Sequence, residues 1–131
     1  MVEHTILIID DDIDLVEILR ITLENSGFRV IDAQTGERGL ALAREQDPDL
    51  ILLDVMMGKV DEGFQVAYQL RSDEVTAQTP ILMLTAVADQ TGFDFDPKRD
   101  KDFLPVNEFL EKPVSPRTLV DMIRKHLPTS V

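Results

Sequence analysis

The sequence predicts an α/β fold in which five parallel β-strands alternate with α-helices that cover both faces of one sheet. The apolar runs Thr5–Ile9 and Leu50–Met57 carry most of this prediction, because strands this hydrophobic are buried on both faces. Between the strands lie segments with helical spacing of apolar residues, and every parallel connection needs such a crossover. At 131 residues the chain has the size of one domain. We therefore expect a single domain over 1–131 with a core of about 4–127.

Two strand–helix units make up the first half of the chain. The run Thr5–Ile9 is continuous, apolar and β-branched, which is typical of a buried strand. The helix that follows ends at Gly27, because glycine can take the left-handed conformation that stops a helix. Its expected core face comprises Leu15, Ile18, Leu19 and Leu23. A short strand, Phe28–Ile31, then leads to a helix that is capped by Thr35 and ends before Pro48.

The second half continues the alternation of strands and helices. A third strand is expected at Asp49–Asp54, and a third helix runs from Phe64 to Gln78. The fourth strand, Pro80–Thr85, begins with a proline, which a strand tolerates at its first position. The fifth strand is Glu108–Glu111. Ser115, as a cap followed by proline, starts the last helix.

The segment 87–107 interrupts this regular pattern. Gly92, Pro97 and Pro105 break it, and its acidic, basic and aromatic residues follow no clear helical period. We expect an irregular or shortened fourth helix there, and we interpret its acidic residues as a solvated loop rather than a second metal site.

Composition excludes several classes of function. The net charge of −12 argues against a nucleic-acid backbone or an anionic membrane as a direct partner, since both are bound through excess Lys and Arg. The absence of cysteine excludes disulfides, thiolate metal sites and cysteine nucleophiles. No apolar run approaches the roughly 20 residues of a membrane span, and the N-terminus lacks the features of a signal peptide. These observations predict a cytoplasmic protein.

Reactive residues gather at one edge of the predicted sheet. Asp10 and Asp11 follow the first strand, Asp54 ends the third, Thr85 ends the fourth, and Lys112 follows the fifth. Parallel strands deliver their carboxyl ends to the same edge, where ligands of open α/β sheets bind. Carboxylates about 5 Å apart repel by roughly 3 kcal/mol per pair at an effective dielectric near 20, so a divalent cation is implied. Oxygen ligands without His or Cys fit Mg²⁺, and a hydroxyl with a lysine suits a phosphoryl group that a carboxylate attacks.

The arrangement resembles the receiver domain of two-component response regulators. The matching residues are the acidic turn in Ile8–Asp12, Asp54 within Leu52–Met57, Thr85-Ala86 and Lys112-Pro113. The resemblance covers essentially the whole chain, and four motifs in this order, each at a strand end, form a specific signal. It implies a flavodoxin-like, doubly wound (βα)5 sheet with the strand order 2-1-3-4-5.

The resemblance implies a role for each residue of the acidic edge. Asp54 would be the phosphoacceptor, and Mg²⁺ would be bound directly by Asp11, Asp54 and the backbone carbonyl of Met56. Asp10 would bind the ion through water, and Lys112 would contact a phosphoryl oxygen. The domain would thus promote its own phosphorylation and dephosphorylation rather than act as a turnover enzyme.

The resemblance also implies a switch and a set of partners. Thr85 would move toward the phosphoryl group and Phe109 would turn inward, which changes the surface of the fourth helix, fifth strand and last helix. The phosphate would come from the phosphohistidine of a sensor histidine kinase or a histidine phosphotransfer protein, or from a small phosphodonor. A downstream protein would read the changed surface, and the chain would be a monomer or a phosphorylation-dependent homodimer.

Three departures from the family pattern are visible. Gly58 stands where the family usually has proline, and Glu62 is an extra residue before Gly63. The span from Thr85 to Lys112 is several residues longer than usual. No effector domain follows, so the chain is either a single-domain protein or a piece that ends after its first domain.

Two other functions stay open at this stage. The first is a receiver-like interaction module that works without phosphorylation, which the altered loop after Met57 favours. The second is a phosphatase of the haloacid dehalogenase type, because Asp10-Asp11-Asp12 contains an Asp-x-Asp motif after the first strand. The phosphatase hypothesis leaves Asp54 unexplained.

Overall fold

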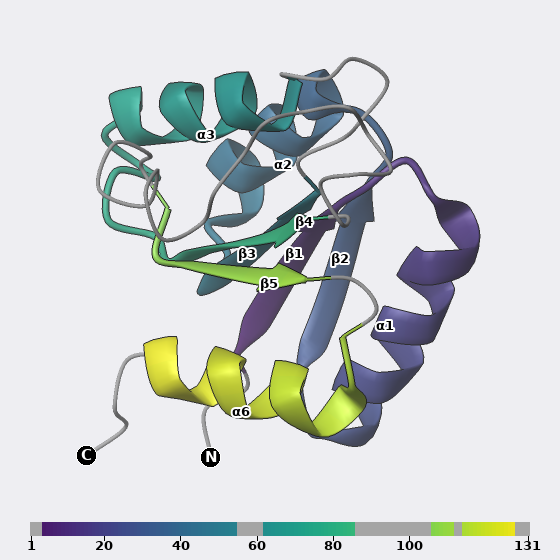
Figure 1. Cartoon of the computed structure of the whole chain (residues 1–131). Helices are drawn as coiled ribbons and strands as arrows, with labels where there is room; N and C mark the ends of the chain where they lie inside the picture. The colour runs from purple at the N-terminus through teal and green to yellow at the C-terminus, as the bar shows by residue number, and fades with distance from the viewer. Residues whose placement is uncertain (1–3, 55–61, 86–105, 112–113, 128–131) are drawn as a thin grey trace.

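A single parallel sheet of five strands organises the molecule (Figure 1). The computed structural model describes residues 4–54, 62–85, 106–111 and 114–127, without the side chains of residues 62, 85, 109 and 111. The strands are β1 (Thr5–Ile9), β2 (Arg29–Ala33), β3 (Leu50–Asp54), β4 (Ile81–Thr85) and β5 (Glu108–Glu111), in the order β2-β1-β3-β4-β5. The helices in these ranges are α1 (Ile13–Asn25), α2 (Gly36–Gln46), α3 (Glu62–Ser72) and α6 (Pro116–His126). The predicted fold class and the flavodoxin-like order 2-1-3-4-5 are confirmed.

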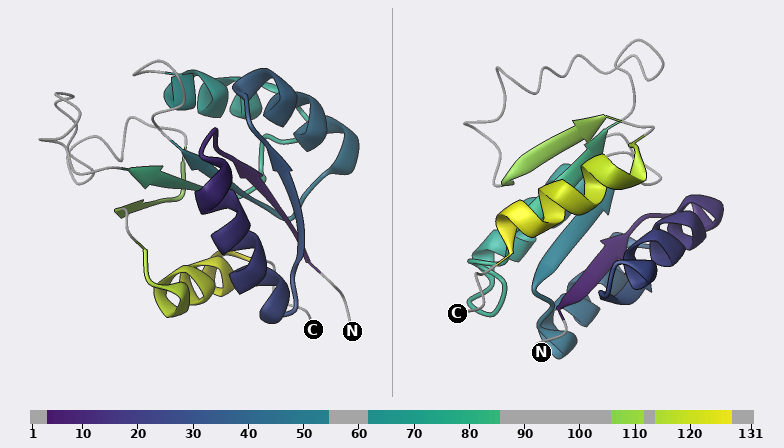
Figure 2. Two further views of the ribbon diagram at one scale, coloured as in Figure 1. Left: turned by 90° about the vertical axis from the view of Figure 1, so that its right-hand side faces the viewer. Right: turned by 90° about the horizontal axis from the view of Figure 1, so that it is seen from below.

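Helices cover both faces of the sheet, which explains why its central strands are so apolar. α1 and α6 lie on one face, and α2 and α3 lie on the other (Figures 1 and 2). Along β3, Leu50 and Leu52 belong to the cluster under α1 and α6, while Ile51 and Leu53 belong to the cluster under α2 and α3. This alternation is the two-residue period of a strand. Every residue of β3 is therefore buried, including the terminal Asp54.

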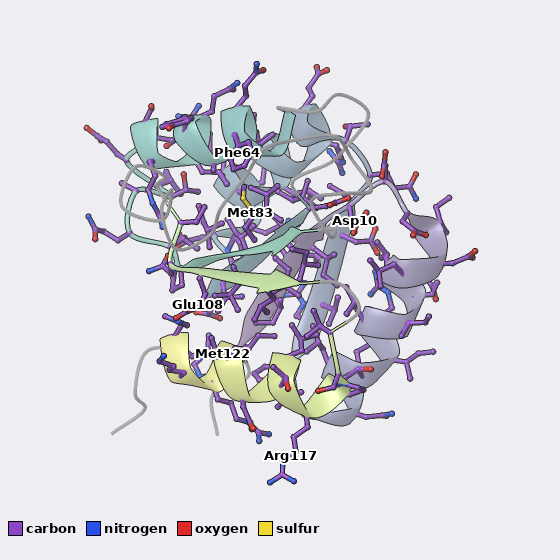
Figure 3. All side chains as sticks on the ribbon, in the orientation of Figure 1. Asp10, Phe64, Met83, Glu108, Arg117 and Met122 are labelled. Carbon is purple, nitrogen blue, oxygen red and sulfur yellow. The ribbon has the colours of Figure 1, made fainter. Side chains whose placement is uncertain are left out.

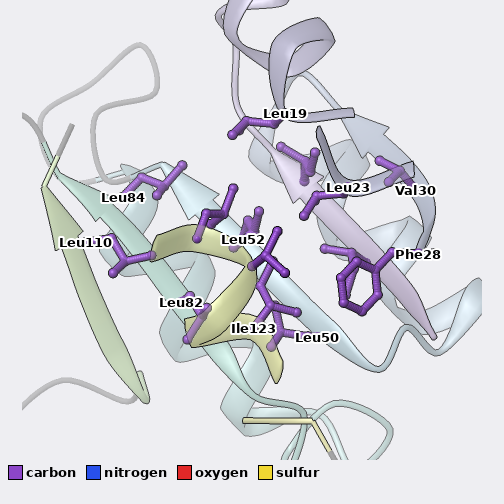
Figure 4. Packing of buried hydrophobic residues seen from close by; sticks show 14 of the residues in the cluster. Leu19, Leu23, Phe28, Val30, Leu50, Leu52, Leu82, Leu84, Leu110 and Ile123 are labelled. Atoms are coloured by element: carbon purple, nitrogen blue, oxygen red, sulfur yellow. The ribbon is translucent and has the colours of Figure 1, made fainter. Parts of the chain in front are cut away.

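The core under α1 and α6 corrects one detail of the predicted helix face. Val16, Leu19 and Leu23 of α1 are buried against the sheet, and α6 contributes Leu119, Val120 and Ile123 (Figure 4). Ile18, which we expected in the core, is 60% exposed. With 3.6 residues per turn, the stripe centred on Leu19 and Leu23 leaves Ile18 on the far side of the helix. Val16, which we did not expect in the core, is 4% exposed.

The bounds of β2 and the end of α3 also differ from the prediction; strand pairing accounts for the first and a local turn for the second. β2 runs over Arg29–Ala33 rather than Phe28–Ile31, because it pairs residue by residue with β1, from Thr5↔Arg29 to Ile9↔Ala33. The helix expected to reach Gln78 ends at Ser72. There the Asp73 side chain accepts a hydrogen bond from the backbone N–H of Val75 at 2.9 Å and starts a turn. The fourth helix that we expected over 87–107 falls largely outside the described residues.

Several local signals are confirmed. Thr35 caps α2 by accepting from the Arg38 N–H at 3.1 Å, and Ser115 caps α6 by accepting from the Thr118 N–H at 3.2 Å. Gly27 follows α1 with φ +93°, the left-handed conformation expected there.

Gly39 of α2 lies so close to β1 that an added Cβ would stand 2.5 Å from Ile9 Cδ1. Glycine at this position therefore sets how closely α2 approaches the sheet.

Candidate functional site

Three carboxylates meet at the carboxyl-terminal edge of the sheet. β1 and β3 are parallel neighbours with Ile9 paired to Leu53, so Asp10 and Asp54 emerge side by side. Together with Asp11 they each offer an oxygen, and these oxygens all lie within 4.8 Å of one another. Asp10 is 0% exposed and Asp54 is 3% exposed, whereas the Asp11 side chain faces solvent. We call Asp10, Asp11 and Asp54 the acidic cluster.

The backbone turn after β1 fixes the orientation of Asp10. Its N–H donates to the Ala33 carbonyl at 3.0 Å, which continues the pairing with β2. Its Oδ1 accepts from the Asp12 N–H at 3.0 Å. Asp12 in turn caps α1, since its Oδ1 accepts from the Leu15 N–H at 3.2 Å. The third acid of the run thus starts the helix and is not a member of the acidic cluster.

The chemistry of this donor set fits a hard divalent cation. Three carboxylates at this separation repel by roughly 3 kcal/mol per pair when the effective dielectric is near 20, and burial of two of them limits screening by water. All donors are oxygens, and none is His or Cys. Mg²⁺ prefers this set, because it binds through one or two carboxylates and keeps waters or phosphate oxygens in its other positions. The acidic cluster therefore fits Mg²⁺.

The other predicted site residues are placed only in part. Thr85 is the last residue of β4. Because Asp54 pairs with Leu84, β4 ends at the same edge of the sheet as the acidic cluster. Phe109 lies in β5 opposite Met83. The side chains of Thr85 and Phe109 are not described. Met56 and Lys112 lie outside the described residues, as does Gly58, so the predicted carbonyl ligand, phosphoryl contact and altered loop stay predictions.

At the opposite edge of the sheet lies a connection that no sequence pattern marks. Glu108, which starts β5, and Asp10 lie at the two ends of the sheet in Figure 3. Next to Glu108, Asn107 accepts a hydrogen bond from Arg71 of α3, a residue 36 positions earlier. Periodicity and motif spacing are local signals, so they carry no information about a pair this far apart in the sequence.

No helix in the described parts of the chain combines the length and apolarity needed to cross a lipid bilayer.

Comparison with known proteins identifies a family for nearly the whole chain. Residues 6–124 match the family of response regulator receiver domains. Among solved structures, the chemotaxis response regulator CheY4 of Vibrio cholerae superposes with a TM-score of 0.82 at 28% identity, covering 96% of this chain and 100% of that one. The N-terminal domain of a response regulator receiver protein from Methanoculleus marisnigri gives a TM-score of 0.70 at 30% identity, covering 97% and 98%.

Curated relatives are transcriptional regulators that are longer than this chain. The phosphate regulon regulatory protein PhoB of Pseudomonas aeruginosa is 35% identical over 124 residues, which is 95% of this chain and 52% of PhoB. PhoP of Bacillus subtilis, a regulator of alkaline phosphatase synthesis, is 42% identical over 112 residues, or 86% and 43% of the two chains. The DNA-binding regulator RpaA of Synechocystis is 52% identical over 82 residues, or 63% and 34%. The chain thus spans about a third to a half of the length of these relatives.

The match over 6–124, the fold and the acidic edge of the sheet agree with one another. The chain belongs to the response regulator receiver family, whose members are phosphorylation-activated signalling switches rather than turnover enzymes.

Proposed function

We propose that the chain accepts a phosphoryl group onto Asp54 from a phosphohistidine of a sensor histidine kinase or a histidine phosphotransfer protein, in a Mg²⁺-dependent reaction. The observation that carries this proposal is the acidic cluster: the buried carboxylate that ends β3 lies within 4.8 Å of the Asp10 and Asp11 oxygens. A nucleophilic carboxylate needs a neighbouring counter-charge to meet an anionic phosphoryl group, and this donor set is suited to hold one.

The cluster divides the roles among its carboxylates. One oxygen of Asp10 is engaged by the Asp12 N–H, which holds its side chain within the turn. Asp54 is the buried carboxylate that ends β3, and it stands at the position that the resemblance to receiver domains gives to the phosphoacceptor. We therefore assign the attack on phosphorus to Asp54. Asp11, Asp54 and the Met56 carbonyl are the proposed direct ligands of Mg²⁺, with Asp10 bound through water.

The proposed transfer conserves atoms and charge. An Asp54 oxygen forms a bond to phosphorus as the bond from phosphorus to the histidine nitrogen breaks, and the imidazole leaves with that electron pair and takes up a proton. Mg²⁺, when bound, supplies positive charge to the phosphoryl oxygens. Lys112 contributes a second positive charge, and the Thr85 hydroxyl donates a hydrogen bond to the same group.

The phosphate acts as a switch because it adds charge beside a packed sheet. Thr85 ends β4 and pairs with Glu111 at the end of β5, so a movement of Thr85 toward the phosphoryl group is transmitted to β5. Phe109 on β5 is the proposed aromatic that reorients. The surface formed by β5, α6 and the segment before β5 would then change its affinity for a downstream protein or for a second copy of the chain.

One experiment tests this proposal against its alternatives. The protein is incubated with Mg²⁺ and acetyl phosphate, and the phosphoryl adduct is detected by intact mass. In a separate titration, the binding of beryllofluoride, a mimic of the phosphoryl group, is measured. We expect one phosphoryl adduct that Asp54→Asn abolishes. Asp12→Asn is the matched control, because asparagine still caps α1 and the removed charge lies outside the acidic cluster.

Other outcomes would favour other functions. Sustained release of phosphate that survives Asp54→Asn and is lost in Asp10→Asn would indicate the phosphatase. The absence of both an adduct and Mg²⁺ affinity would indicate an interaction module that works without phosphorylation.

A further inference from the structure

Arg71, in the last turn of α3, joins three segments at the edge where the strands begin. Its Nη1 donates to the carbonyl oxygens of Thr76 at 3.2 Å and Thr79 at 2.6 Å, and its Nη2 donates to Asn107 Oδ1 at 2.9 Å. Burial lowers the pKa of the Arg71 guanidinium from its ordinary value, because it gives up part of its water for these contacts. A guanidinium presents its donors in a rigid planar fork, so it holds all three acceptors in one arrangement.

Asn107 extends the pairing between β4 and β5 by one position. Its backbone N–H donates to the Ile81 carbonyl at 2.8 Å, and its side-chain Oδ1 accepts from the Ile81 N–H at 2.8 Å. Both backbone polar groups of Ile81 are thus paired with one residue, and the Asn107 side chain takes the place of a strand carbonyl. Because the same Oδ1 also accepts from Arg71, the pairing of β4 with β5 is linked directly to α3. We call the hydrogen bonds that Asn107 Oδ1 accepts from Arg71 and from the Ile81 N–H the tie.

The register of β5 depends on this tie together with contacts to α6, where Glu108 lies 3.1 Å from His126 and 3.6 Å from Lys125. β5 is an outer strand of four residues, so it pairs with β4 alone. A slip of one residue would expose the buried Leu110, but a slip of two keeps every side chain on its face while moving the strand about 7 Å. The observed register pairs Thr85 with Glu111, and Lys112 is the next residue of the chain.

We propose that Arg71 is a positioning residue: through Asn107 it fixes the register of β5, and thereby the point at which β5 ends, one residue before Lys112, which we propose as the phosphoryl contact. This inference rests on the proposed function, since the place of Lys112 affects a rate only if Asp54 accepts phosphate. It adds to that function a control point on α3 and β5, outside the acidic cluster.

A positioning role differs from a merely structural one in what it leaves unchanged. The acidic cluster is built on β1 and β3, whereas the contacts of Arg71 reach β4 and β5. Losing the tie should therefore lower the phosphorylation rate at saturating Mg²⁺ without changing the affinity for Mg²⁺. An arginine that only stabilised the fold would change the unfolding transition and leave the rate of the folded protein as it is.

The experiment compares variants that remove the tie with variants that keep it. Arg71→Ala removes the donor, and Asn107→Ala removes the shared oxygen while leaving the two carbonyl contacts of Arg71 in place. Asn107→Asp keeps an oxygen that can accept from both donors, so it should retain the tie. Arg44→Ala is the matched control, because Arg44 is exposed and pairs at 3.0 Å with Asp73 in the turn that follows α3.

Three measurements are made on each variant in the full chain: the rate of Asp54 phosphorylation by acetyl phosphate at saturating Mg²⁺, the Mg²⁺ affinity, and amide hydrogen exchange at Ile81 and residues 107–111. For Arg71→Ala and Asn107→Ala we expect a rate about tenfold to a hundredfold lower, faster exchange at these amides, and unchanged Mg²⁺ affinity. Asn107→Asp and Arg44→Ala should behave like the unsubstituted protein. If Arg71→Ala does not fold, Asn107→Ala carries the test.

The outcomes separate this inference from the proposed function. Unchanged exchange at β5 in the Asn107→Ala protein, or faster exchange with an unchanged phosphorylation rate, would overturn the positioning role. Failure of the unsubstituted protein to form any Asp54 adduct would refute the proposed function instead. In that case faster exchange in Arg71→Ala, but not in Arg44→Ala, would still establish the register tie, and unchanged exchange would refute it as well.

Discussion

At the scale of single residues, the buried carboxylate of Asp10 combines a local hydrogen bond with electrostatic repulsion from the other two carboxylates of the acidic cluster. Its Oδ1 accepts from the Asp12 N–H, while its side chain also faces the oxygens of Asp11 and Asp54. Asparagine keeps the hydrogen-bond acceptor and removes the charge. The local structure and the repulsion can therefore be separated by one substitution.

We predict that Asp10→Asn stabilises the protein without divalent ions and weakens its response to Mg²⁺. Removing one charge from the acidic cluster relieves repulsion, which should raise the free energy of unfolding by roughly 1 to 3 kcal/mol. Urea unfolding with a chelator, and then with Mg²⁺, measures both effects. Asp12→Asn serves as the control for a carboxylate outside the cluster, and a loss of stability in Asp10→Asn without Mg²⁺ would contradict the prediction.

Lys112 provides a second prediction at this scale. Because we place its ammonium on a phosphoryl oxygen rather than on the metal, Lys112→Ala should leave Mg²⁺ affinity nearly unchanged and slow the formation of the Asp54 adduct. Mg²⁺ titration and the acetyl phosphate assay test the two halves separately. Arg117→Ala, which removes an exposed cation of α6 that pairs with Asp121 of the same helix, is the control. A collapse of Mg²⁺ affinity in Lys112→Ala would show that its assigned role is wrong.

At the scale of elements, α1 shows how one helix divides its apolar residues between core and surface. Leu23 is 0% exposed and lies in the cluster under α1 and α6, whereas Ile21, two residues earlier, is 58% exposed. Arg20, the residue before Ile21, connects α1 to the sheet by donating to the Val30 carbonyl at 3.0 Å and pairing with Asp32. Apolar character alone therefore does not tell which isoleucines and leucines of α1 stabilise the fold.

The matched pair Leu23→Ala and Ile21→Ala tests this division. Leu23→Ala should lower the free energy of unfolding by about 2 to 5 kcal/mol, because it leaves a cavity in a packed core. Ile21→Ala should change it by no more than about 0.5 kcal/mol, since its side chain is largely in water already. Urea unfolding of both variants gives the comparison, and equal losses of stability would mean that Ile21 is buried in solution.

At the scale of the whole molecule, the net charge of −12 opposes the compact state through self-repulsion. Monovalent salt screens this repulsion generally, whereas a specific divalent cation acts at the acidic cluster. The two effects can be told apart by keeping the ionic strength constant.

We predict that Mg²⁺ stabilises the protein beyond an equal ionic strength of NaCl. At a concentration ten times its dissociation constant, a ligand of the folded state raises the free energy of unfolding by about 1.4 kcal/mol. Thermal or urea unfolding in matched buffers measures the difference, and Asp54→Asn should reduce it. Equal stabilisation by NaCl in the unsubstituted protein would mean that the acidic cluster does not bind Mg²⁺.

Local sequence patterns were sufficient to predict the sheet, its covering by helices and the gathering of acids at one edge. Apolar runs such as Thr5–Ile9 reveal burial on both faces, caps such as Thr35 act within a few residues, and parallel pairing sends the strand ends to a common edge. The proximity of Asp10 and Asp54 therefore follows from the sequence, because the direction of the parallel strands brings both residues to one edge of the sheet.

Packing and long-range contacts decided the rest. The exposure of Ile18 depends on which stripe of α1 meets the sheet, and the extent of β2 depends on its partner β1. The tie between Arg71 and Asn107 joins residues 36 positions apart, and only the folded chain brings them together. The physical reason is the same in each case: periodicity records what neighbours in the chain prefer, whereas register and burial are set by which surfaces meet after the chain has folded.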